Sequence, residues 1–161
     1  MAQLLIVYHS RTGGARQMAE AAAEAARDEA EVVLKPADQA GSEDLLQADG
    51  YIFCAPENLA AISGLMKEFF DRSYYPVLGR IEGRPYAQMI CAGSDGENAA
   101  RQTARIATGW RLKEVQPPLI ICTHAQTPEA ILAEKTIPDD QLENCRELGL
   151  AMAAGLQMGV F

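Results

Sequence analysis

The sequence predicts an α/β fold in which a parallel β-sheet lies between two layers of helices. Three observations support this prediction. Short apolar runs alternate with helix-like segments along all 161 residues, the apolar runs are continuous, and no repeat or linker interrupts the order. A strand that is apolar on both faces must be covered on both faces. Residues 1–161 are therefore expected to form a single domain, a three-layer sandwich around a five-stranded parallel sheet.

The first strand and helix give the clearest signal. Residues 4–8 form an apolar run, and a polar turn that contains Gly13 and Gly14 leads into an alanine-rich segment that ends at residue 30. Apolar side chains recur three and four positions apart in that segment, at positions 15, 18, 19, 22 and 26. This spacing predicts an amphipathic helix that follows a buried strand.

The later elements are predicted from the same two patterns. Further strands are expected at residues 31–35, 51–55, 86–92 and 119–123, and helices at 42–46, 62–75, 98–109 and 138–155. Residues 56–58 are expected to break the third strand, and residues 124–137 to be irregular. Right-handed crossovers leave few arrangements, and five strands suit the order 2-1-3-4-5.

Three loops are expected to meet where this strand order reverses, past the carboxyl ends of strands one, three and four. They span residues 10–14, 56–59 and 93–96, and all are rich in Gly, Pro and small polar residues. The first precedes a helix, whose free N–H groups and dipole attract anions. It therefore suits a phosphate, although an ordinary strand-to-helix turn would use similar residues. The other two loops could bracket a flat ring.

Composition and charge exclude several classes of protein. The formal net charge of −8 argues against broad nucleic-acid binding, and no apolar run reaches the ~20 residues of a membrane span. With no signal-like segment at the start, a soluble cytoplasmic protein is expected. Four scattered cysteines and two histidines predict buried free thiols and no metal site. The P-loop and Gly-x-Gly-x-x-Gly motifs are both absent.

The sequence resembles the flavodoxin-like family, and within it the branch of NAD(P)H-dependent FMN reductases and quinone reductases. The resemblance rests on Ser10-Arg11-Thr12-Gly13-Gly14, on Pro56-Glu57-Asn58 and on Ala92-Gly93-Ser94-Asp95-Gly96. The most specific segment is Ser63-Gly64-x-Met66-Lys67-x-Phe69-Phe70-Asp71-Arg72, because reductases of this branch carry a similar helix after the flavin loop. The strand-helix order agrees over essentially the whole chain.

The resemblance implies one FMN per chain, reduced by NAD(P)H and reoxidised by a small acceptor such as a quinone. It implies that the phosphate binds Ser10, Arg11, Thr12, Gly13, Gly14 and Ala15. The ring would lie between Pro56, Glu57, Asn58 and Leu59 on one side and Ala92, Gly93, Ser94, Asp95 and Gly96 on the other. The cofactor carries the chemistry, so no catalytic acid–base residue is expected. Related reductases often pair, so the resemblance also allows a homodimer.

Two departures from the family keep alternatives open. The family loop often ends in Thr, Ser or Asn where this chain has Ala15, so one phosphate donor is missing. The ring loops lack the aromatic residues of electron-carrier flavodoxins, which favours a reductase or a weakly held, exchangeable flavin. A flavodoxin-type carrier without its own hydride donor is the main alternative, and a flavin-free scaffold is another. A phosphoacceptor domain would need acidic residues that His9 and Ala55 replace.

Overall fold

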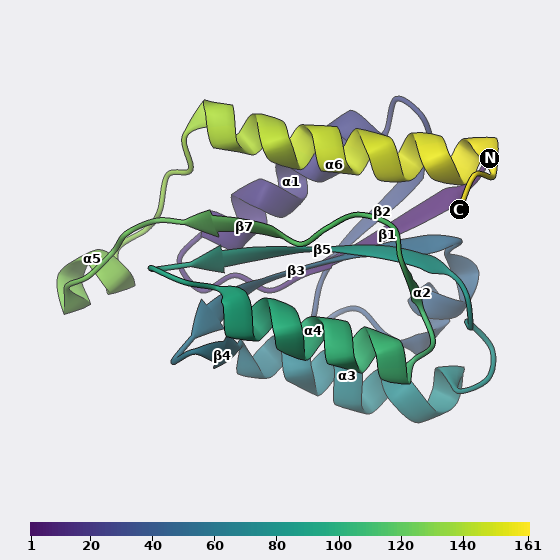
Figure 1. Cartoon of the computed structure of the whole chain (residues 1–161), viewed down its shortest axis with the longest axis horizontal. Coiled ribbons are helices and arrows are strands. Elements are labelled where there is room, and N and C mark those ends of the chain that lie inside the picture. The colour runs from purple at the N-terminus through teal and green to yellow at the C-terminus, as the bar shows by residue number, and fades with distance from the viewer.

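The computed structural model describes all 161 residues and contains the expected alternation of strands and helices (Figure 1). The strands are β1 (Gln3–Tyr8), β2 (Glu31–Pro36), β3 (Gly50–Asn58), β4 (Ala61–Ile62), β5 (Pro85–Ala92), β6 (Lys113–Glu114) and β7 (Leu119–Cys122). The helices are α1 (Gly14–Ala26), α2 (Ser42–Gln47), α3 (Gly64–Val77), α4 (Glu97–Gly109), α5 (Pro128–Leu132) and α6 (Asp139–Met158).

The sheet has the predicted strand order. Strands β2, β1, β3 and β5 pair in parallel in that order, and β6 and β7 both pair with β5 at the far edge. The predicted fifth strand, residues 119–123, is β7, and β6 is an additional short strand that the sequence did not predict; a segment that contains Pro117 and Pro118 separates the two. Proline has no N–H to donate to a ladder, so consecutive prolines interrupt the pairing there.

The helices form two layers. Helices α1 and α6 cover one face of the sheet, and α3 and α4 cover the other, with α2 beside them (Figure 1). The alternation of side chains along β1 explains why both faces need cover: Leu4 and Ile6 pack on the α1 and α6 side, whereas Leu5 and Val7 pack on the α3 side. This confirms the predicted flavodoxin-like three-layer sandwich.

The connections differ from the sequence prediction in three places. Strand β3 does not break at residue 56 but continues to Asn58 and turns back through β4. Pro56 is tolerated because the pairing of β1 with β3 ends at Cys54, so no ladder bond from Pro56 toward β1 is needed. Helix α1 ends at Ala26 instead of residue 30. The segment predicted as irregular contains helix α5 (Figure 1).

Candidate functional site

A cavity of about 500 Å³ opens at the carboxyl edge of the sheet, where β1, β3 and β5 end. Twelve of the fifteen predicted site residues line it: Ser10, Arg11, Thr12, Gly14, Ala15, Pro56, Glu57, Asn58, Leu59, Ala92, Gly93 and Ser94. Gly13, Asp95 and Gly96 belong to the same loops but do not face this cavity. The volume lies within the range of about 300–1,000 Å³ that is usual for small-ligand sites.

The loop after β1 presents the amino end of α1 to the cavity. Gly13 has a φ of 95°, a left-handed conformation that favours glycine, and precedes the first helical residue. Its N–H donates to Ser10 Oγ at 3.0 Å, so the Ser10 hydroxyl keeps its own proton for another acceptor. The first turn of α1 contains no acidic residue. The positive end of the helix dipole is therefore not neutralised locally.

The second wall of the cavity is the hairpin formed by β3 and β4. Leu59 and Ala60 connect these strands with φ angles of 51° and 60°, and Leu59 is fully exposed at the mouth of the cavity. Two neighbouring left-handed residues match a tight hairpin turn that usually contains Asn or Gly. The side chain of Asn98 donates to the Ala60 carbonyl, and the Ile62 N–H donates to Gln102 Oε1 at 2.8 Å. Helix α4 thus holds the hairpin in place.

Glu57 joins the hairpin to the loop after β5. Its two carboxylate oxygens accept hydrogen bonds from the backbone N–H groups of Gly96, at 2.9 Å, and Ala99, at 3.0 Å. The Glu57 carboxylate therefore occupies the amino end of α4, and Glu97 adds a further negative charge to the same turn. Helix α4, unlike α1, has little capacity left to attract an anion.

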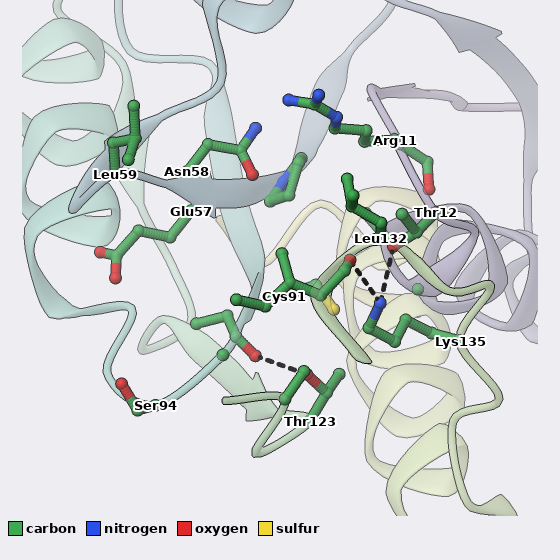
Figure 2. Close-up of a pocket in the computed structure, with 18 of the residues that line it drawn as sticks. Arg11, Thr12, Glu57, Asn58, Leu59, Cys91, Ser94, Thr123, Leu132 and Lys135 are labelled. Atoms are coloured by element: carbon green, nitrogen blue, oxygen red, sulfur yellow. Dashed lines mark hydrogen bonds between the residues drawn. The ribbon is translucent and has the colours of Figure 1, made fainter. Parts of the chain in front are cut away.

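The floor and the outer wall contain residues that the sequence prediction did not include. Cys91 lines the cavity, and burial raises the pKa of its thiol to about 11, so the thiol is neutral at physiological pH. The outer wall comes from the connection between β7 and α6, which contributes Thr123, Ala125, Gln126, Ile131, Leu132 and Lys135. Figure 2 shows Lys135 beside Thr12 and Leu132, across the cavity from Asn58 and Leu59.

The outer wall, which the sequence prediction did not include, lies where the rule used for the three predicted loops would place it: past the carboxyl end of a parallel strand. Strand β7 is parallel to β5, so its carboxyl end lies at the same edge of the sheet. The His124 N–H donates to the Gly93 carbonyl at 2.8 Å and fixes this connection to the loop after β5. Thr127 and Pro128 carry the start signal of α5: the Thr127 hydroxyl accepts from the Ala130 N–H at 3.2 Å.

His9 lies beside the first loop of the site, outside the lining of the cavity. His9 is held by a hydrogen bond of 2.8 Å between its Nδ1 and Ser63 Oγ, which ties the first loop to the start of α3. His, Cys, Asp and Glu side chains form no cluster that could hold a metal ion. None of the helices combines the length and the apolar character that crossing a bilayer requires.

Known proteins share both the sequence pattern and the fold. The chain is 42% identical to a flavodoxin of Aquifex aeolicus over 96 residues. This aligned segment covers 58% of this chain and 50% of the relative. Over 95 residues it is 30% identical to an NAD(P)H dehydrogenase (quinone) of Acidithiobacillus ferrooxidans, covering 45% of this chain and 48% of the relative. The chain thus spans about half the length of the curated relatives it matches.

Solved structures show the same fold, and a family model matches the sequence. A flavodoxin from the domain Archaea has the same fold, with a TM-score of 0.77 and 18% identity over 96% of this chain and 99% of that one. Residues 17–126 match the family model of NADPH-dependent FMN reductases. This match confirms the flavodoxin-like resemblance, and it confirms FMN as the predicted cofactor. Because it spans more than half of the sequence, the chain belongs to the NADPH-dependent FMN reductase family.

Proposed function

We propose that the chain is an FMN-dependent oxidoreductase that takes a hydride from NAD(P)H and passes electrons to a small acceptor such as a quinone. The flavin phosphate binds the loop formed by residues 10–15, and the ring lies between residues 56–59 and 92–96. Twelve of these fifteen residues line the cavity, and Gly13, Asp95 and Gly96 support it through the backbone of the same loops.

The observation that carries this proposal is the charge difference between the two ends of the cavity. The α1 end has Arg11 and Lys135 and no acidic residue in the first helical turn. At the α4 end the N–H groups are already bonded to Glu57. An anion with a flat, uncharged ring attached is therefore favoured in one orientation, with the anion at α1.

The place of the first loop in the fold supports its assignment as the phosphate site, since the family match covers only residues 17–126. The loop at residues 10–15 lies before that match, so its assignment depends on its place in the fold. That loop is at the carboxyl end of β1, next to β3, which is the point where the strand order reverses. Open parallel sheets bind their ligands at this point.

When bound, FMN would accept the hydride from NAD(P)H and pass electrons to the acceptor, and the chain's own residues would bind and orient it. Helix α1 and the hydroxyl groups of Ser10 and Thr12 hold the anion. The hairpin at Leu59 and the loop at Gly93 and Ser94 limit how the ring can tilt. Because a hydride would pass directly from the nicotinamide to the flavin, we expect no acid or base in the cavity to be essential for flavin reduction.

An electron carrier that binds FMN and accepts no hydride is the second candidate. The observation in its favour is the 42% identity to a flavodoxin of Aquifex aeolicus. Both candidates are expected to bind FMN, but only the oxidoreductase is expected to be reduced by NAD(P)H. The pairing of two chains, which the resemblance allows, also stays a prediction.

The experiment has two stages. The purified chain is first titrated with FMN, and binding is measured from flavin fluorescence and from the melting temperature. The FMN complex is then mixed with NADH or NADPH under anaerobic conditions. Bleaching of the flavin absorption band at saturating NADH or NADPH supports the oxidoreductase. An unchanged absorption spectrum supports the carrier. Failure to bind FMN at all would contradict both.

A further inference from the structure

Lys135 precedes α6 and lines the side of the cavity that faces α1. Its ammonium group donates to Thr12 Oγ1 at 3.3 Å and to the Ile131 carbonyl at 2.8 Å (Figure 2). We propose that Lys135 is a ligand of the flavin phosphate, supplied to the loop at residues 10–15 from the far end of the chain. This inference rests on the proposed function, since it adds a residue to the same site.

The backbone of Lys135 is fixed before any ligand binds. Its N–H donates to the Thr12 carbonyl at 2.8 Å, and its carbonyl accepts from Gln17 Nε2 at 2.7 Å. The Oε1 atom of Gln17 also accepts from the Ile137 N–H at 2.9 Å, so one α1 side chain holds both sides of this short segment. A position fixed in this way places the ammonium group next to the loop at little entropic cost.

The charges around the cavity make Lys135 the best placed cation. The chain has a formal net charge of −8, so a dianion needs local positive charge to bind. Arg11 and Lys135 are the basic side chains that line the cavity; Arg11 is exposed, whereas Lys135 is half-buried and therefore less screened. Arg16 is nearby, but it lies 3.7 Å from Glu134 and 3.8 Å from Glu20.

Lys135 also compensates for a gap in the loop itself. Ala15 stands where related loops often carry a hydroxyl or amide side chain, and it is buried with only a methyl group to offer. An ammonium group has three donors, and one already points at Thr12 Oγ1, within the loop that would surround the phosphate. A phosphate at this loop can draw the ammonium from its carbonyl partners, because charged acceptors bind it more strongly.

A purely structural role for Lys135 makes a different prediction. Its ammonium group also donates to the Ala133 carbonyl, so it could serve only to close the carboxyl end of α5. A phosphate ligand acts on FMN and not on riboflavin, which has the same ring and no phosphate. A residue that only shapes the cavity affects both flavins alike. The ratio of the two affinities therefore separates the roles.

The test compares wild type, Lys135→Met, Lys135→Arg and the control Lys113→Met. Lys113 is an exposed residue of β6, outside the lining of the cavity. Affinities for FMN and riboflavin are measured by fluorescence at low and high salt. Lys135→Met is expected to weaken FMN binding by about tenfold to a hundredfold, the loss of one hydrogen bond to a charged group, with riboflavin unchanged within about twofold. Lys135→Arg is expected to restore most of the loss.

Each outcome decides the proposal. If Lys135→Met weakens both flavins by the same factor, or leaves FMN binding intact, Lys135 is not a phosphate ligand, while the proposed function stands. If wild type binds neither flavin, the proposed function itself fails. The FMN affinity of wild type should also fall more steeply with salt than that of Lys135→Met, and equal slopes would contradict direct charge contact.

Discussion

The carboxylate of Glu57 accepts a hydrogen bond of 2.9 Å from the backbone N–H of Gly96. Glu57 lies in strand β3, and Gly96 precedes helix α4, so this bond joins two of the loops that form the cavity. The same carboxylate accepts from Ala99 at 3.0 Å. A side chain that the sequence suggested as a flavin ligand thus has its carboxylate directed at the protein.

Replacing Glu57 with Gln is expected to loosen the walls of the ring site without changing the phosphate site. One of the two N–H groups loses its acceptor, and the remaining bond is no longer made to a charge, so the free energy of unfolding should fall by about 1–3 kcal/mol. The affinities for FMN and riboflavin should fall by equal factors. Urea unfolding and flavin fluorescence measure the two effects.

Glu97→Gln is the matched control for this change. Glu97 also lies in the first turn of α4, so the variant removes the same charge from the same helix end without removing the contacts of Glu57. Only the helix-dipole contribution should be lost, about 0.3–1 kcal/mol. A loss as large as that of Glu57→Gln, or a larger effect of Glu57→Gln on FMN than on riboflavin, would contradict the assigned role.

The sequence was informative about elements whose signals are local. The alternation of Leu4 and Leu5 between the two cores, and the period of α1 with Met18 and Ala22 facing inward, depend on short-range patterns that the chain repeats many times. The strand order was predictable because right-handed crossovers leave few choices. The three loops followed from that order.

The parts that could not be predicted depend on contacts between distant residues. Strand β3 continues past Pro56 because the neighbouring β1 has already ended, a fact of register that local sequence does not contain. Lys135 reaches Thr12 across 123 positions of sequence, and Glu57 reaches Gly96 across 39. The short helix α5 has no buried residue, so hydrophobic periodicity gives no signal for it.

Helices α1 and α6 approach each other closely at Gly149, and this contact makes a second prediction. A Cβ atom at Gly149 would clash with the Ala22 carbonyl oxygen, which is a backbone atom and cannot turn aside. Gly149→Ala should therefore force the helices apart and lower the free energy of unfolding by about 1–3 kcal/mol. Thermal or urea unfolding measures it.

The control for this change is Gly109→Ala. Gly109 is the last residue of α4 and is exposed, and a Cβ atom added there would meet no neighbouring atom within 4 Å. Alanine has the higher helix propensity, so this variant should leave stability unchanged or raise it by up to about 1 kcal/mol. If Gly149→Ala were equally harmless, the close approach of the two helices would be wrong.

The third prediction concerns pH and His9, whose Nδ1 bonds to Ser63 Oγ at 2.8 Å. Burial lowers the pKa of His9 below its ordinary value of 6.5; Asp38 raises it and Arg11 lowers it by smaller amounts. In the window just below pH 6.5 the unfolded chain therefore holds a proton that the folded chain does not. Stability contributed by neutral His9 is present above this window and is lost as the pH falls through it.

The measurement is urea unfolding of wild type and His9→Asn at pH 7.5, 6.5 and 5.5. Asn keeps a hydrogen-bonding group near the position of Nδ1 but does not titrate, so its stability should depend less steeply on pH than that of wild type. Carboxylates titrate mostly below this range and affect both proteins alike. Parallel stability curves for the two proteins would show that the His9 imidazole is equally protonated in the folded and unfolded chains, and that its burial beside Ser63 has no effect on proton binding.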